Sequence, residues 1–141
     1  MSLGRTRKKM AQRQRRGAAV VEFAFVAPLM ILLTLGMLEL GRMVMVKQIM
    51  VNASREGARD AVLPGATSES VQASVEAELA AASISGATIT ITPSVLSSAA
   101  EGTAVTILIS VPAADISWIP KPLYSLQNTI EASTTMRKEA S

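Results

Sequence analysis

Residues 18–38 read AAVVEFAFVAPLMILLTLGML, and this stretch decides the fold. Its only charge is Glu22, and its only other clearly polar residue is Thr34. As a helix it would span about 31 Å at ~1.5 Å per residue, close to the ~30 Å thickness of a bilayer's hydrocarbon core. The alternative is a buried core helix, but so short a chain cannot easily supply enough apolar surface to wrap one. The stretch therefore predicts a membrane span.

The segment before this stretch is strongly basic. Residues 1–17 hold seven of the fourteen Lys and Arg of the chain and no acid, whereas the next twenty residues after the span hold only Arg42, Lys47 and Arg55. The positive-inside rule then places the N-terminus in the cytoplasm and the C-terminal part outside. A basic segment can also bind nucleic acid, but this one has no aromatic residue and adjoins the span. It therefore predicts contact with anionic lipid headgroups and no nucleic-acid partner.

A secretory signal peptide has the same order of charge and apolar residues. Its apolar core is usually only ~7–15 residues long and ends at a small-residue cleavage site. Here no such site follows the apolar run before Glu39, and the small residues Gly17, Ala18 and Ala19 precede it instead. A cut there would remove the basic leader and keep the hydrophobic helix.

The span continues into an amphipathic segment over residues 39–62. Aliphatic residues recur there at three- to four-residue multiples beside charged ones, namely at Val44, Val51, Ala58 and Val62. The pattern predicts one long helix from about Ala18 to about Leu63, ended by Pro64-Gly65. Pro28 lies within it and frees the carbonyl of Ala24, so we expect a helix kink at Pro28.

The rest of the chain predicts a small domain with one more helix and about three strands. Thr67 or Ser68 can cap the helix, whose apolar stripe is Val71, Val75, Leu79 and Ala82. Alternating residues predict strands at 87–92, 103–111 and 128–136, with the only Trp and Tyr, Trp118 and Tyr124, in the loop before the third.

The predicted fold class is therefore α+β, with a long N-terminal transmembrane and amphipathic helix followed by one helix and about three antiparallel strands. The predicted divisions are a basic cytoplasmic leader at 1–17, the helix at 18–63 and a small extracytoplasmic domain at 64–141.

The composition argues against an enzyme. The chain has no His and no Cys, which excludes His-based acid/base catalysis, Cys nucleophiles and Cys/His zinc sites. It contains no phosphate-binding glycine loop and no nucleophile-elbow motif, and its acids show no metal-binding spacing. We therefore predict no catalytic residue, no metal and no cofactor.

Glu22 is the one polar group that the span must accommodate. A charged residue at mid-membrane costs about 2.5–3.5 kcal/mol on insertion scales. Glu22 lies four residues after Ala18, only ~6 Å along the helix, so its side chain can reach the headgroups and have no further role. The other interpretation is that it pairs with the free α-amino group of Ala18 in a neighbouring subunit.

The sequence around the apolar stretch resembles a known family. RRGAAVVEFAFVAPLMILLTLGMLELGR at 15–42 is similar to the TadE-like family of pseudopilins from tight-adherence (Flp, type IVb) pilus systems, and NASREGARDAV at 52–62 also lies where that family has similar residues. Gly17 before the cut and Glu22 as the fifth residue after it are typical of a prepilin processing site.

The resemblance implies a single-pass inner-membrane precursor that prepilin peptidase cuts between Gly17 and Ala18. It implies other pilin or pseudopilin subunits and the Tad assembly machinery as partners, with Glu22 balancing the Ala18 amine of a neighbour. Nearly eighty residues follow Leu63, which fits a minor pilin or pseudopilin better than a short major subunit. The alternative is an unprocessed signal-anchored membrane protein whose outward domain binds a ligand or envelope partner.

Overall fold

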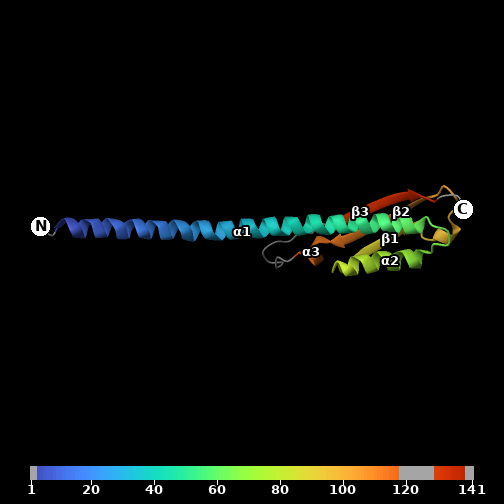
Figure 1. Cartoon of the computed structure of the whole chain (residues 1–141), viewed down its shortest axis with the longest axis horizontal. Coiled ribbons are helices and arrows are strands. Elements are labelled where there is room, and N and C mark those ends of the chain that lie inside the picture. The colour runs from blue at the N-terminus through green and yellow to red at the C-terminus, as the bar shows by residue number, and fades with distance from the viewer. Residues whose placement is uncertain (1–2, 118–128, 139–141) are drawn as a thin grey trace. The chain divides into compact units, whose positions relative to one another are not determined.

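The computed structural model describes residues 3–117 and 129–138. In chain order the elements are α1 (Leu3–Ala61), α2 (Ser68–Ala81), β1 (Thr88–Thr92), the 3-10 turn η1 (Leu96–Ser98), β2 (Ala104–Pro112), the short helix α3 (Ala113–Ile116) and β3 (Thr129–Arg137) (Figure 1). The expected α+β class, with a long helix followed by a helix and three antiparallel strands, is confirmed.

The chain divides into two compact units, Met1–Leu38 and Glu39–Ser141, called here unit 1 and unit 2. Unit 2 thus contains residues 39–61 of α1 as well as the segment after Leu63.

Unit 1 consists of the first part of α1. The helix begins at Leu3, upstream of the expected start near Ala18, and its helical assignment runs through Pro28 without a break. Each large hydrophobic side chain between Val20 and Leu38 is exposed. The most apolar window of 18 residues has a mean hydropathy of 2.3 and none of it is buried, so the helix is long and apolar enough to cross a membrane.

Unit 2 is built on a three-stranded sheet with the order β1-β2-β3 and antiparallel pairing throughout. Ile109 of β2 lies opposite Ile89 of β1 and Ala132 of β3. Strand β2 alternates between buried and partly exposed residues, as a strand with one covered face should. The buried members are Val105, Ile107, Ile109 and Val111.

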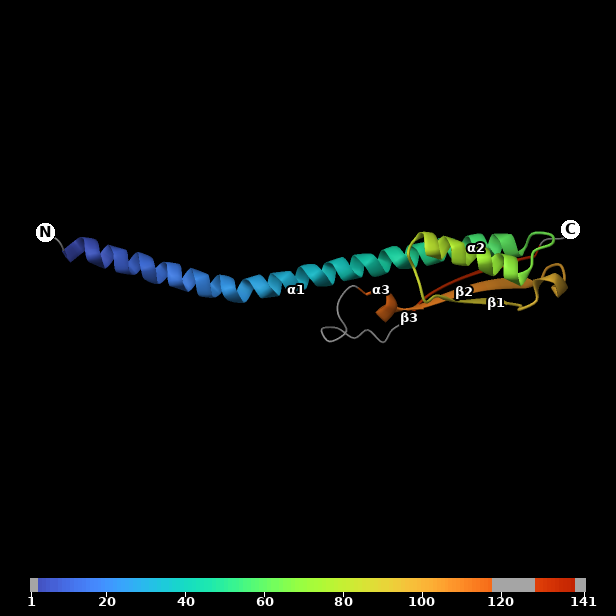
Figure 2. The ribbon, with the colours of Figure 1, turned by 90° about the horizontal axis from the view of Figure 1, so that it is seen from below.

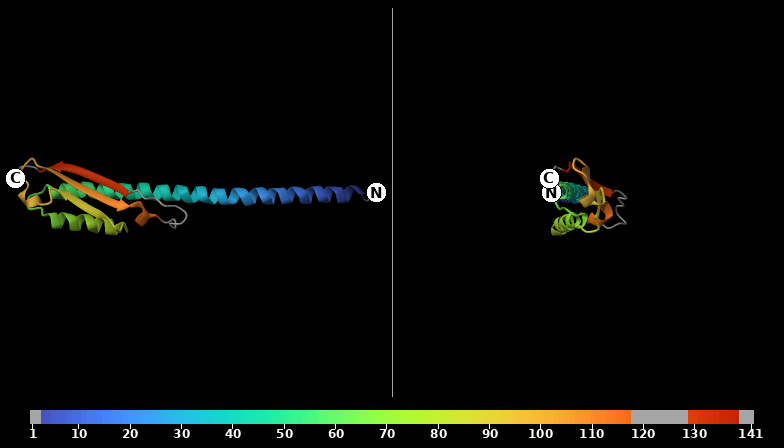
Figure 3. Two further views of the ribbon diagram at one scale, coloured as in Figure 1. Left: turned by 180° about the vertical axis from the view of Figure 1, so that it is seen from behind. Right: turned by 90° about the vertical axis from the view of Figure 1, so that its right-hand side faces the viewer.

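Residues 39–61 of α1 and helix α2 cover the same face of this sheet (Figures 2 and 3). The Ser54 hydroxyl of α1 lies 2.8 Å from the Thr134 hydroxyl of β3, which places α1 over that strand. Helix α2 contacts β1. The opposite face of the sheet carries mainly hydroxyl side chains, including the exposed Thr90 and Ser133. Unit 2 therefore has two layers, one of helices and one of strands, and the second face of its sheet is polar.

Helix α2 follows the sequence prediction closely. Thr67 is the N-cap, and its hydroxyl accepts a hydrogen bond from the Ser70 amide at 3.2 Å. Val71, Val75 and Leu79 form the buried stripe. The chain then leaves the helix through a turn in which the Ile84 amide donates to the Leu79 carbonyl at 2.9 Å.

The aliphatic repeat of the amphipathic segment coincides only in part with the buried face of α1. Ala58 is buried, but Val51 and Val62 are only partly buried and Val44 is 62% exposed. The residues that face the sheet and α2 are largely small or flexible ones, namely Val46, Met50, Ala53, Ser54, Gly57, Ala58 and Ala61.

The three strands lie within one residue of their predicted bounds. The loop predicted before the third strand contains α3, which the sequence pattern did not indicate, whereas Trp118 and Tyr124 lie outside the described residues.

Candidate processing and assembly site

The predicted processing site lies on the regular part of α1. Gly17 and Ala18 are both exposed, and a Cβ atom built at Gly17 would meet no other atom within 4 Å. Both residues belong to unit 1. Both residues are therefore exposed on the helix, and no packing contact among the described residues requires glycine at position 17.

Glu22 lies one helical turn after Ala18 and is exposed. Among the residues whose side chains the structure describes, 17–117 and 129–138, none forms an ion pair with Glu22. The structure thus brings Gly17, Ala18 and Glu22 together on successive turns of one helix.

Pro28 lies two turns further on and is exposed. Its ring nitrogen cannot donate to the Ala24 carbonyl, so that carbonyl lacks its usual helical partner. The Thr34 hydroxyl donates a hydrogen bond to the Met30 carbonyl at 2.8 Å. Its hydrogen-bonding capacity is thus used within the helix. A polar residue bonded in this way is tolerated in an apolar segment.

The first turn of unit 2 contains two charged residues, Glu39 and Arg42, whose tertiary environment could not be predicted from the sequence. Glu39 is only 6% exposed, and the Arg42 Nε donates to the Ile116 carbonyl of α3 at 2.7 Å. This bond joins residues 74 positions apart and ties α1 to the end of α3 where the apolar segment gives way to unit 2. The ELGR motif at 39–42 was the available signal, but no local pattern named its partner.

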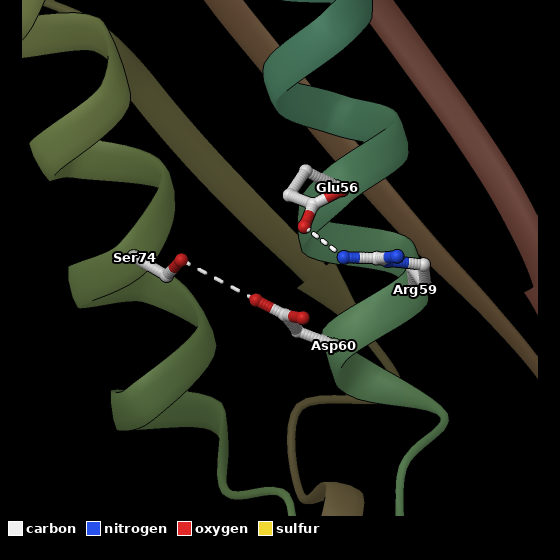
Figure 4. Close-up of polar contacts among 4 residues, drawn as sticks. All are labelled: Glu56, Arg59, Asp60 and Ser74. Carbon is white, nitrogen blue, oxygen red and sulfur yellow. Dashed lines mark hydrogen bonds and ion pairs between the residues drawn. The ribbon is translucent and has the colours of Figure 1, made fainter.

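Three other polar contacts join α1 to β3 and α2. The Lys47 ammonium donates to the Glu131 carbonyl of β3, and the Ser54 hydroxyl bonds both the Val51 carbonyl at 2.9 Å and Thr134. Near the end of α1, Arg59 pairs with Glu56 on the same helix and Asp60 accepts a hydrogen bond from Ser74 of α2 at 3.3 Å (Figure 4).

Gly57 allows the two helices to approach closely. A Cβ atom at this position would lie 2.5 Å from the Val75 Cγ2 of α2 and 3.7 Å from the Ile107 Cγ2 of β2. Because real Cβ atoms do not approach other atoms so closely, only glycine fits between α2 and the sheet without a shift. Gly57 was quoted in the motif at 52–62, but its packing role depends on a residue of the next helix.

Across residues 17–117 and 129–138 the acidic side chains form no group of three that could hold a metal ion. The arrangement of the described residues therefore consists of an exposed apolar helix with a small-residue junction at its start and a packed α+β unit at its end.

These features define a small α+β unit preceded by a helix that is long and apolar enough to cross a membrane. Residues 17–59 match the family described as TadE-like protein, which confirms the TadE-like resemblance over the apolar and amphipathic parts of α1. The match supports a component associated with Tad pilus systems. No curated protein and no solved structure matches the chain.

Proposed function

We propose that this chain is a minor pilin or pseudopilin, a structural assembly component of a Flp/Tad type IVb pilus system. The observation that carries the proposal is the junction at Gly17. Seven cations precede it, an exposed apolar helix follows it, and the family match begins at that residue. A structural role without catalysis is part of the same proposal.

In this proposal prepilin peptidase cuts between Gly17 and Ala18 on the cytoplasmic side of the inner membrane. Gly17 has no side chain, so the catalytic groups of a peptidase can approach the adjacent peptide bond closely. The exposed helix then remains in the membrane with a free amine at Ala18. Unit 2 faces outward, as the distribution of Lys and Arg around the span indicates.

Glu22 has the assembly role in the mature subunit. Its carboxylate pairs with the Ala18 amine of a neighbouring subunit, and the pair is strongest where water is scarce. The exposed position of Glu22, one turn from Ala18, supports this role. The partners are other pilin or pseudopilin subunits and the Tad assembly machinery.

The test is the N-terminal sequence and mass of the protein recovered from membranes of cells with a Tad system. We expect a chain that begins at Ala18. Gly17→Leu should accumulate as an uncut precursor, whereas Gly36→Leu, a matched change at another glycine of α1 with no neighbouring atom within 4 Å, should still be cut.

Glu22→Gln separates cleavage from assembly. It removes the charge with little change in volume, so we expect normal cleavage and membrane abundance with reduced pilus assembly. Normal pili in Glu22→Gln cells would leave Glu22 as a residue that only reaches the headgroups. A wild-type protein that retains residues 1–17 would instead favour the alternative of an unprocessed, signal-anchored protein whose outward domain binds a ligand or envelope partner.

A further inference from the structure

Charge is unevenly distributed over unit 2. Residues 60–117 contain six acidic residues and no Lys or Arg. The cations described in unit 2 all lie on α1 or at the end of β3, at Arg42, Lys47, Arg55, Arg59, Arg137 and Lys138. Helix α2 thus carries acids and no cation, whereas α1 and β3 carry charges of both signs.

The acidic face is formed by Glu69, Gln72 and Glu76 on α2, all of which are exposed. The Gln72 amide donates to Glu76 Oε1 at 2.8 Å, so these two side chains lie along one side of the helix. Ser74 marks the other side, because it points toward Asp60 of α1 (Figure 4). At ~100° per residue, Glu76 lies about 200° around the helix from Ser74. The acidic face is thus turned away from α1.

The basic face is formed by Asn52, Arg55 and Arg59 of α1 and Arg137 of β3. Arg55, Arg59 and the side chain of Met136 line one surface hollow, and Arg59, Met136 and Arg137 line the next. Acids also border these hollows, at Glu56, Glu78 and Glu101. With Lys138, the linings of the two hollows hold four cations and three acids, so a net charge of one positive unit remains although Glu56 pairs with Arg59.

We infer that the acidic face of one copy docks on the basic face of a second copy of this chain. The inference rests on the proposed role as an assembly component. The two faces lie on different elements, and the acidic one is turned away from α1, so a two-fold contact centred on either face alone would place like charges together. A head-to-tail contact instead joins opposite charges, and each added copy still offers one face of each kind. The same surface can therefore repeat along a row of copies.

The charges determine which two surfaces meet and in which register they meet. Exposed pairs are screened by salt, with a Debye length of about 10 Å at 0.1 M and about 3 Å at 1 M ionic strength. The contact should consequently weaken at high salt, whereas a contact made only by the apolar helices should not.

The absence of cysteine from the chain makes a cross-linking test direct. The full chain in its native membrane receives Ala73→Cys, which lies between Glu69 and Glu76 on α2, together with Asn52→Cys on the basic face. A short bifunctional maleimide should give dimers, trimers and longer products. Each single-cysteine variant should stay monomeric, because its cysteine meets the cysteine-free face of the neighbour.

Two controls define the surface. The pair Ala73→Cys and Ser133→Cys has the same number of thiols but places one on the hydroxyl-rich sheet face, and it should give no series of products. In the Ala73/Asn52 pair, Glu69→Lys with Glu76→Lys should lower the cross-linked fraction about fivefold or more, on the basis of two exposed ion pairs. Adding Arg55→Glu and Arg137→Glu to that chain should restore cross-linking.

Dimers from either single-cysteine variant would overturn the inference, since they indicate a symmetric contact. Products that contain another polypeptide, products insensitive to salt and charge reversal, or no products at all would also overturn it. The mass of the chain in the same membranes reports removal of residues 1–17. A processed chain that fails to cross-link therefore contradicts the docking surface alone, and an unprocessed chain contradicts the proposed cleavage.

Discussion

The same helix meets two different environments in units 1 and 2. In unit 1 the large apolar side chains of α1 all point to the surroundings, for example Phe25 at 78% exposure. In unit 2 the helix buries mainly small residues, and Met50 is its largest fully buried side chain. Hydrophobicity alone therefore does not identify the packed part of α1. The apolar surroundings of a bilayer suit the first part, whereas close packing determines the second.

The largest expected difference between the two units concerns methionine. Met50→Ala should destabilise unit 2 by about 2–5 kcal/mol, because it leaves a cavity at a site with no exposed surface. Met37→Ala, at a 65% exposed position of unit 1, should leave unit 2 unchanged. Hydrogen exchange of the β2 amides in the detergent-solubilised full chain measures both effects. Equal protection in the two variants would contradict the assignment of Met50 to the packed core.

Glycine gives the next largest contrast. Gly57→Leu should destabilise unit 2 by about 1–3 kcal/mol or more, because even its Cβ would lie 2.5 Å from Val75. Gly36→Leu meets no atom within 4 Å and should have no effect on unit 2. The same exchange measurement applies, and Val75→Ala added to Gly57→Leu should recover part of the loss. If the glycine variants do not differ, α1 and α2 do not pack as closely as described.

Hydroxyl groups give the smallest effect. Ser54→Ala removes the contact with Thr134 and should cost about 0.5–1.5 kcal/mol of unit 2 stability. Thr34→Ala removes only a bond to the Met30 carbonyl within α1 and should leave unit 2 stability as it is. A double-mutant cycle of Ser54→Ala with Thr134→Val isolates the pair, and a coupling energy of zero would show that the contact does not stabilise the fold.

Local periodicity was sufficient to predict α2 and the strands. Val71, Val75 and Leu79 repeat at the helical period, and Val105, Ile107, Ile109 and Val111 occupy every second position of β2, so each element has one apolar face. The packed stripe of α1 was not predictable in this way. Scales of hydrophobicity rank Val44 above Gly57, but the close approach of α2 makes Gly57 the buried residue.

The candidate site likewise has one part that could be predicted from local sequence and one part that could not. Gly17, Ala18 and Glu22 form a contiguous motif, so the sequence alone brings them together on one helix. The tie between Arg42 and Ile116 joins positions 74 apart and depends on α3, which lacks a sequence signal. Contacts of this kind require the tertiary fold, whereas a processing motif is read by its order along the chain.

The hydrogen bond from Lys47 to the Glu131 carbonyl bears on whether the sheets of two copies can pair edge to edge. Strand β3 is an edge of the sheet, and an edge strand offers backbone groups to any passing strand. Lys47 places a cation of α1 on that edge, and a charged side chain there discourages further strand pairing. The other edge, β1, is only five residues long. Both edges of the described sheet are therefore poor templates for pairing with a further strand.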